Sequence, residues 1–333
     1  MTTAATDVLA RPPRPSSTPG SPGSPATSPP ASPSLPAPRR RRSRPRWRTY
    51  LTFLLLAGPN VALLVVFVYK PLLQSFQYST LQWNIGSPSA RPVGLGNYVD
   101  WFTDPRTPQV LTTTAIFTVA TVGGSLLIGL GLALLLNRRL AGRGAARTIV
   151  FAPYVLSGIA VGILWLFIFD PRYGLVSTVL GWLGLSSPDW YNDSPWALAM
   201  IIVVYLWKNV GYVALIYLAG LQAVPQELRD AAALDGAGPG RTLRSVVLPL
   251  LGPTTFFLSV TSLLSSLQSF DIIHAMTQGG PLAGTTTLMY QIYQESFVSG
   301  RAGYASAVAT LLFVILAVIT VAHLKLVERK VHY

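Results

Sequence analysis

A single cation with hydrogen-bonding neighbours lies deep in one long apolar stretch of the chain. Lys208 stands about 12 residues inside the stretch Trp196–Leu221, roughly 18 Å along a helix at about 1.5 Å per residue. Tyr205 and Tyr212, at helical spacings of three and four, share its face, and Asn209 adjoins them. A charge at that depth in a bilayer is costly and usually functional. These groups have the chemistry to bind the hydroxyl or anionic groups of a small solute.

A second polar stripe, Thr261, Ser265 and Gln268, follows helical spacing in the next long apolar stretch. Both stripes reach mid-membrane from different helices, which makes their polar groups candidates for binding residues. The alternative is structural, with hydroxyls that pack helices and a Lys208 that pairs with another helix. Asp271 lies near the outer end of its stretch, so a straight helix would separate it from Lys208 by about 13 Å in depth. We therefore interpret Asp271 as an outer-gate or capping residue rather than as the partner of Lys208.

No arrangement of catalytic residues is evident in the sequence. The Walker A pattern G-x-x-x-x-G-K-[ST] is absent, and no nucleophile–base pair has supporting spacing. The chain has no cysteine, and its three histidines are too scattered for a metal site. We expect that the chain is not an enzyme and holds no cofactor or metal of its own.

The polar loop 222–249, between the same two apolar stretches, is predicted to form a short helix. Pro225 suits its start, because the missing N–H of proline would be unpaired there. Gly236 suits its end, because glycine tolerates the left-handed conformation that stops helices. The alanines between them keep the helix slim, so another surface can approach it; the alternative is an ordinary amphipathic loop helix. The candidate contact residues are Glu227, Asp230, Ala231, Ala232, Asp235 and Gly236.

Six apolar stretches are each long enough to cross a bilayer, for which about 20 helical residues suffice. Helices are the physical choice, because the open edges of a sheet cannot be paired in lipid. Half of the residues are hydrophobic and only 11% are charged, which is apolar for a soluble domain. The sequence therefore predicts an all-α membrane protein. The predicted spans are Tyr50–Tyr69, Val110–Leu136, Ile149–Phe169, Trp196–Leu221, Leu250–His274 and Gly303–Leu324.

The net charge of +13 is concentrated near the N-terminus. Nine arginines precede residue 49, with Asp7 as the one opposing charge. A cytoplasmic anchor beside the first span explains this run better than a nucleic-acid surface, so no nucleic-acid partner is expected. Residues 1–38 are rich in Pro, Ser, Ala and Thr and cannot bury enough apolar surface to fold. We therefore divide the chain into a disordered basic tail, 1–49, and a membrane domain, 50–333.

The positive charges between the spans orient the chain. With the tail inside, nineteen lysines and arginines fall in inner segments and five in outer ones. Basic residues are retained on the cytoplasmic side, so both termini are predicted to be cytoplasmic. The loop 222–249 then lies on the inner face as well.

The loop and seven short motifs resemble those of the permeases of binding-protein-dependent ABC importers. Asp230, Ala231, Ala232 and Gly236 match the family pattern E-A-A-x-x-x-G, with aspartate in place of the usual glutamate. Sugar-importing permeases of the maltose and glycerol-phosphate type are also matched, in chain order, at residues 94–98, 151–157, 169–174, 206–212, 221–225, 270–271 and 276–281. The resemblance covers about residues 50–333.

Finer matches separate the members of this family. Residues 279–281 are similar to the maltose-F-type subunit of these paired permeases. The segments most similar to the sn-glycerol-3-phosphate permeases are 235–239, 285–288, 291–293 and 327–333.

The resemblance implies a type I ABC importer permease with six transmembrane helices in the bacterial cytoplasmic membrane. Its partners would be a second permease subunit, an extracytoplasmic solute-binding protein and a cytoplasmic ATPase dimer that holds ATP and Mg. The loop 222–249 would dock on that ATPase, and the two polar stripes would line the sugar site. The expected substrate is sn-glycerol 3-phosphate or a glycerophosphodiester; the alternative is a neutral oligosaccharide such as maltose or trehalose.

Two other classes of function are compatible with a chain of several spans. A membrane scaffold or receptor would use the inner loop as an adaptor site, but it has no need of a lysine in mid-membrane. An ion-coupled secondary carrier is expected to have an acid or broken helices at the midplane, often in repeated halves. The sequence shows no such repeat and no deep carboxylate. A permease driven by ATP hydrolysis on a partner is therefore the favoured hypothesis.

Reporter fusions test the predicted orientation. Fusions after Val224 and after Tyr333 should both read cytoplasmic, because inner segments carry the excess of positive charge. A fusion after Ser187, in a predicted outer segment, is the matched control and should read extracytoplasmic. An extracytoplasmic signal at Val224 or Tyr333 would contradict the orientation.

Overall fold

The computed structural model describes residues 46–138 and 142–328. The chain divides into two units, residues 1–58 and residues 59–333. The predicted disordered tail falls mostly outside the described residues. Helix α1 (Arg46–Leu64) begins four residues before the predicted boundary at Tyr50.

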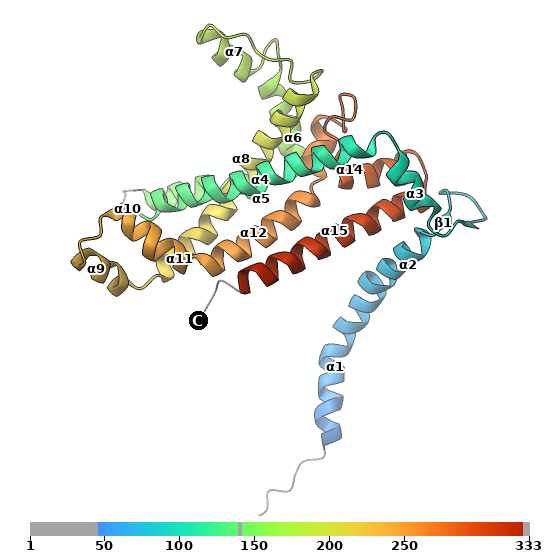
Figure 1. Cartoon of the computed structure of the whole chain (residues 1–333), viewed down its shortest axis with the longest axis horizontal. Helices are drawn as coiled ribbons and strands as arrows, with labels where there is room; N and C mark the ends of the chain where they lie inside the picture. The colour runs from blue at the N-terminus through green and yellow to red at the C-terminus, as the bar shows by residue number, and fades with distance from the viewer. Residues whose placement is uncertain (1–45, 139–141, 329–333) are drawn as a thin grey trace, which may run out of the picture. The chain divides into compact units, whose positions relative to one another are not determined.

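Within the described residues, five helical segments are long and apolar enough to cross a membrane, and a bent pair of helices makes a sixth candidate. The first segment, Tyr50–Tyr78, combines α1, the π-helical turn η1 (Val65–Tyr69) and α2 (Lys70–Tyr78). The other long helices in Figure 1 are α4 (Thr107–Leu136), α8 (Ser194–Ala223), α12 (Gly252–Leu267) and α15 (Ala302–Glu328). The short helix α13 (Asp271–Met276) belongs to the same candidate span as α12. The bent pair is α5 (Arg143–Val155) and α6 (Gly158–Phe169).

Short elements connect these helices. The antiparallel strands β1 (Leu81–Gln82) and β2 (Arg91–Pro92) and the helix α3 (Gly96–Thr103) lie between α2 and α4. Helix α7 (Leu175–Trp182) follows α6, and α14 (Leu288–Tyr293) with the π-helical turn η3 (Gln294–Val298) precedes α15. Between α8 and α12 lie α9 (Gln226–Leu234), α10 (Pro239–Thr242), the π-helical turn η2 (Leu243–Val247) and α11 (Leu248–Leu250).

The predicted third span, Ile149–Phe169, is wrong as a single helix, because α5 and α6 meet at 101°. Pro153 lies in the last turn of α5, where it cannot donate to the carbonyl four residues earlier. Leu156 and Ser157 then adopt extended ψ angles of 148° and 134° and separate the two helices. Irregular backbone at membrane depth is tolerated only where it is buried in protein or lines a water-filled cavity.

The predicted fifth span is also interrupted, since residues 268–270 are not helical and α13 starts after them. Helix α13 packs tightly against α6. A Cβ atom on Gly158 would lie 2.6 Å from the Cβ of Asp271, and one on Gly162 would lie 2.7 Å from the Cβ of Ala275. The two interrupted segments therefore contact each other through small residues.

Glycines also set the distance between the long helices α4 and α8. A Cβ atom on Gly129 would lie 2.6 Å from Cγ1 of Val213, and one on Gly124 would lie 2.9 Å from Cδ2 of Leu206. A buried apolar cluster beside this seam joins α4, α8 and the segment from η2 to α12. Its members are Ala133, Leu136, Val213, Tyr217, Leu218, Leu221, Val247, Leu251 and Leu258.

A buried carboxylate joins the α3–α4 corner to the start of α15. Glu295, in η3, is 3% exposed and pairs with Arg301 and, at 3.8 Å, with Arg106. Arg106 also pairs with Asp104 at 2.8 Å, and this side-chain hydrogen bond holds the pKa of Asp104 below its usual value. The network fixes two corners that lie far apart in the sequence.

The contact between α5 and α8 gives a testable requirement for glycine at position 211. A Cβ atom there would overlap the carbonyl oxygen of Val150. We expect Gly211→Ala to lower the unfolding temperature of the purified chain, because such overpacking costs about 1–3 kcal/mol. The matched control is Gly131→Ala in α4, where a Cβ would meet nothing within 4 Å. Alanine is favoured over glycine in helices by about 1 kcal/mol, so the control should not be destabilised. Equal unfolding temperatures for the parent and Gly211→Ala would contradict the close approach.

Candidate functional site

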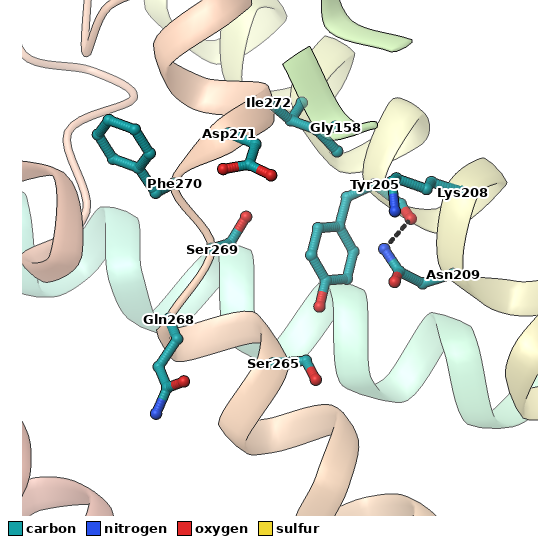
Figure 2. Close-up of a pocket in the computed structure, with 10 residues that line it drawn as sticks. All are labelled: Gly158, Tyr205, Lys208, Asn209, Ser265, Gln268, Ser269, Phe270, Asp271 and Ile272. Carbon is teal, nitrogen blue, oxygen red and sulfur yellow. Dashed lines mark hydrogen bonds between the residues drawn. The ribbon is translucent and has the colours of Figure 1, made fainter. Parts of the chain in front are cut away.

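A polar cavity of about 290 Å³ lies where α6, α8, α12 and α13 come together. We call it the main pocket. Figure 2 draws its lining, which consists of Gly158, Tyr205, Lys208, Asn209, Ser265, Gln268, Ser269, Phe270, Asp271 and Ile272. Both helix interruptions contribute to it, through Gly158 at the start of α6 and residues 268–270 before α13.

Lys208 holds the end of α5 with its ammonium group. Its Nζ donates a hydrogen bond to the carbonyl oxygen of Tyr154 at 3.2 Å and lies 5.4 Å from the centre of the Tyr154 ring. The Tyr154 carbonyl is one of the last four of α5, which have no partner within the helix. A cation is favourable there, because the C-terminal end of a helix carries partial negative charge.

Asp271 lines the same pocket as Lys208, which corrects the separation predicted for a straight helix. The non-helical residues 268–270 carry Asp271 to the first turn of α13, against Gly158. Among the described residues, no ion pair joins Asp271 to Lys208. The lining of the pocket therefore includes one cationic and one anionic side chain.

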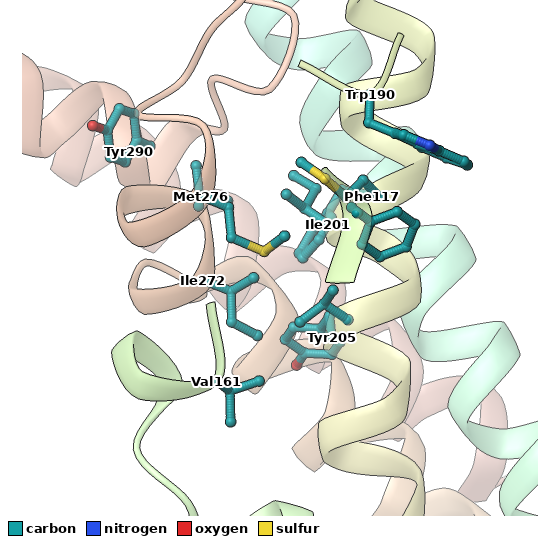
Figure 3. Close-up of a cluster of buried hydrophobic side chains, with 12 residues drawn as sticks. Phe117, Val161, Trp190, Ile201, Tyr205, Ile272, Met276 and Tyr290 are labelled. Carbon is teal, nitrogen blue, oxygen red and sulfur yellow. The ribbon is translucent and has the colours of Figure 1, made fainter. Parts of the chain in front are cut away.

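The wall of the main pocket on α8 is fixed by packing. The side chain of Tyr205 is 6% exposed and meets the ring of Phe117 edge-on, with ring centres 5.3 Å apart. Tyr205 belongs to a buried cluster that Figure 3 shows between α8, α6 and α13, with Val161, Ile201, Ile272 and Met276. Asn209 donates from Nδ2 to the carbonyl of Tyr205 at 2.8 Å, as the dashed line in Figure 2 marks.

A second, smaller cavity adjoins the main pocket along α8 and α12, toward the ends of these helices that flank α9. Its volume is about 20 Å³. It is lined by Ser125, Tyr154, Tyr205, Asn209, Tyr212, Val213, Thr261, Ser262 and Ser265. Three of these, Tyr205, Asn209 and Ser265, also line the main pocket.

All seven residues predicted for the solute path line one or both cavities. Lys208 and Gln268 line the main pocket, and Tyr212 and Thr261 line the smaller cavity. Tyr205, Asn209 and Ser265 line both. Their role in binding stays a prediction. Sequence reasoning missed two lining residues on the same helices, Val213 and Ser262, and others at the interruptions or on other helices: Ser125, Tyr154, Gly158, Ser269, Phe270 and Ile272. Pro153, which precedes the first interruption, is the one sequence signal that pointed to it.

The loop helix α9 forms where the sequence predicts it. Pro225 is the N-cap residue, one position earlier than expected, and Gly236 has a φ of +76°. The amides of Gly236 and Ala237 donate to the carbonyls of Ala233 and Ala232 at 3.0 and 2.9 Å, the two bonds of a Schellman stop. Helix α9 therefore ends through backbone bonds that require the left-handed residue.

The acidic side chains of α9 are open to solvent. Glu227, Asp230, Ala231, Asp235 and Gly236 are exposed, and Ala232 is half-buried. Asp230 accepts one hydrogen bond, from Nε2 of Gln226 at 3.0 Å, which leaves most of its carboxylate free for a partner. On the other face, Arg229 donates to the carbonyl of Leu221 at 2.6 Å and ties α9 to the end of α8.

Residues 125–333 match the family described as binding-protein-dependent transport system inner membrane component. The chain belongs to this family. It is 37% identical over 284 residues to the sn-glycerol-3-phosphate transport system permease protein UgpA of Agrobacterium fabrum, covering 84% of this chain and 95% of the relative. The same protein of Yersinia pestis is 36% identical over 292 residues, covering 87% and 99%.

The solved structure of a bacterial ABC transporter involved in alginate import contains a similar fold. The TM-score is 0.75 at 24% identity, over 85% of this chain and 97% of that chain. The predicted ABC importer permease fold and the resemblance stated from the motifs are confirmed. The chain is thus a multi-pass membrane permease of the ABC importer class. Family membership also answers the secondary-carrier alternative, because this family consists of components of binding-protein-dependent transport systems.

Proposed function

We propose that this permease imports sn-glycerol 3-phosphate or a glycerophosphodiester. The observation that carries the proposal is the main pocket, where Lys208 lies among hydroxyl and amide groups. A phosphate must lose much of its water at this depth, and an ammonium offsets that cost through a charge-assisted hydrogen bond. The similarity to permeases of sn-glycerol-3-phosphate transport systems supports the same solute class.

The remaining groups of the pocket suit the glycerol part of such a solute. Asp271 accepts hydrogen bonds from hydroxyls, and Ser265, Ser269 and Gln268 both donate and accept. These groups favour a second candidate as well, a neutral oligosaccharide, because sugar hydroxyls use the same partners and Phe270 offers a ring to stack on. The charge of Lys208 is the feature that separates the two candidates.

The proposal includes the partners that supply energy and solute. A cytoplasmic ATPase dimer would bind ATP and Mg and receive the exposed acidic face of α9, with Glu227, Asp230 and Asp235. A second permease subunit would complete the path, and an extracytoplasmic protein would deliver the solute. In this arrangement both termini lie in the cytoplasm and the assembly lies in the bacterial cytoplasmic membrane, with residues 50–333 as the permease domain.

Uptake by the reconstituted assembly tests the solute class through Lys208. Lys208→Met keeps most of the side-chain volume and removes the charge. Uptake of glycerol 3-phosphate should fall roughly tenfold or more, since a charge-assisted bond contributes about 1.5–3 kcal/mol and each 1.4 kcal/mol is tenfold. Lys325→Met, at an exposed lysine of α15, is the matched control and should transport normally.

Competition distinguishes the two candidate solutes in the same assay. Unlabelled glycerol 3-phosphate and glycerophosphodiesters should inhibit uptake, and neutral disaccharides should not. Inhibition by disaccharides alone would refute the glycerol-phosphate proposal and favour the neutral oligosaccharide.

The proposed coupling role of α9 is tested at its acidic face and at its stop. Asp230→Lys places a cation where the family pattern has an anion, and Gly236→Val strains the left-handed residue by about 1 kcal/mol or more. Both variants should reach the membrane at normal levels but lose solute-stimulated ATP hydrolysis. Gly240→Val is the control, because Gly240 has no positive φ and a Cβ there would meet nothing within 4 Å. Full stimulation in Asp230→Lys would show that α9 does not couple the ATPase to transport.

A further inference from the structure

Two stacked rings line the smaller cavity beside the main pocket. Tyr154, from the end of α5, and Tyr212, from α8, have ring centres 4.8 Å apart and planes at 16°. Both line the smaller cavity, whose volume of about 20 Å³ holds about one water, since a water needs at least about 10–15 Å³. A cavity of this volume does not hold a solute of the size of glycerol phosphate.

Lys208 links these rings to the main pocket. It lines the main pocket but directs its ammonium to the carbonyl and ring of Tyr154. Both attractions depend on the full positive charge, one through the negative end of α5 and the other through the electron-rich face of the ring. An anion bound beside Lys208 would neutralise that charge and weaken both contacts at once.

We propose that Tyr154 and Tyr212 form a gate on the α9 side of the main pocket, and that Lys208 keeps it shut until a bound anion takes its ammonium. The gate depends on the proposed function for one point only, the identity of the anion, which is a phosphate ester. Tyr154 is well placed for this role, because it lies two residues before the interruption at Leu156 and Ser157. The end of α5 can therefore move without displacing α6.

The absence of cysteine from the chain allows a direct test of the gate. Ser262→Cys places one thiol in the smaller cavity, outside the main pocket. The complete transporter in proteoliposomes is labelled with a membrane-impermeant maleimide from the side that exposes α9. Labelling of the parent should be slow and should rise about fivefold with glycerol 3-phosphate, as expected when contacts of about 1 kcal/mol are lost.

Variants in the Ser262→Cys background test the ring and the ammonium one at a time. Tyr154→Leu removes the ring and should raise labelling without solute by roughly the same fivefold. Lys208→Met removes the ammonium and should also raise labelling without solute. Addition of glycerol 3-phosphate should then have no further effect on labelling. If Tyr154→Leu does not assemble, Tyr212→Leu is used in its place, because it removes the other ring of the stack. The matched control is Phe167→Leu, at a ring of α6 that is 73% exposed and lines neither cavity, and it should label like the parent.

Uptake of glycerol 3-phosphate, measured on the same vesicles, distinguishes failure of the gate from failure of the proposed function. Unchanged labelling in the tyrosine variant or in Lys208→Met, with normal uptake by the parent, would overturn the gate and leave the proposed solute standing. Raised labelling in both variants, with no uptake of glycerol 3-phosphate by the parent, would support the gate and overturn the proposed solute.

Discussion

Backbone groups freed by a helix interruption at membrane depth must find partners in protein or in a water-filled cavity. This constraint accounts for where the main pocket lies. The α5–α6 interruption leaves the Tyr154 carbonyl without a helix partner, and Lys208 supplies one at 3.2 Å. The α12–α13 interruption exposes residues 268–270 to the same cavity. Both interruptions therefore face one polar cavity, and the charge of Lys208 is placed where it satisfies a backbone carbonyl.

Small residues make this convergence possible. The start of α6 reaches α13 only because Gly158 and Gly162 have no side chain, since a Cβ on either would lie within 2.7 Å of Asp271 or Ala275. On the opposite side, Gly211 lets α8 approach the carbonyl of Val150 on α5. The helices that line the cavity are therefore brought together at glycines.

The sequence predicted the helical spans and the loop helix well, because each has a local signal. Apolar length identifies a span, and the pair Pro225 and Gly236 marks the start and stop of α9. All seven residues predicted for the solute path also line the two cavities, since polar side chains at helical spacing stand out in an apolar stretch. The interruptions were missed, because Leu156 is as apolar as its neighbours and hydropathy carries no information on backbone angles. That error also misplaced Asp271, whose depth was counted along a straight helix.

Helix α8 connects the loop to the pocket as one continuous element of 30 residues. Its middle carries Tyr205 to Tyr212, and its end is tied to α9 by the bond from Arg229 to the carbonyl of Leu221. Nine residues separate Tyr212 from Leu221, a distance of about 14 Å along the axis at 1.5 Å per residue. Near the same end, a Cβ on Gly220 would lie 2.8 Å from Oγ1 of Thr254, so α8 also touches the start of α12. A displacement of α9 therefore acts on α8 and α12, two of the helices that line the smaller cavity. Because an unbroken helix resists bending, α8 can carry that displacement to Tyr212 and Tyr205, whereas α5 is free to respond at its interruption.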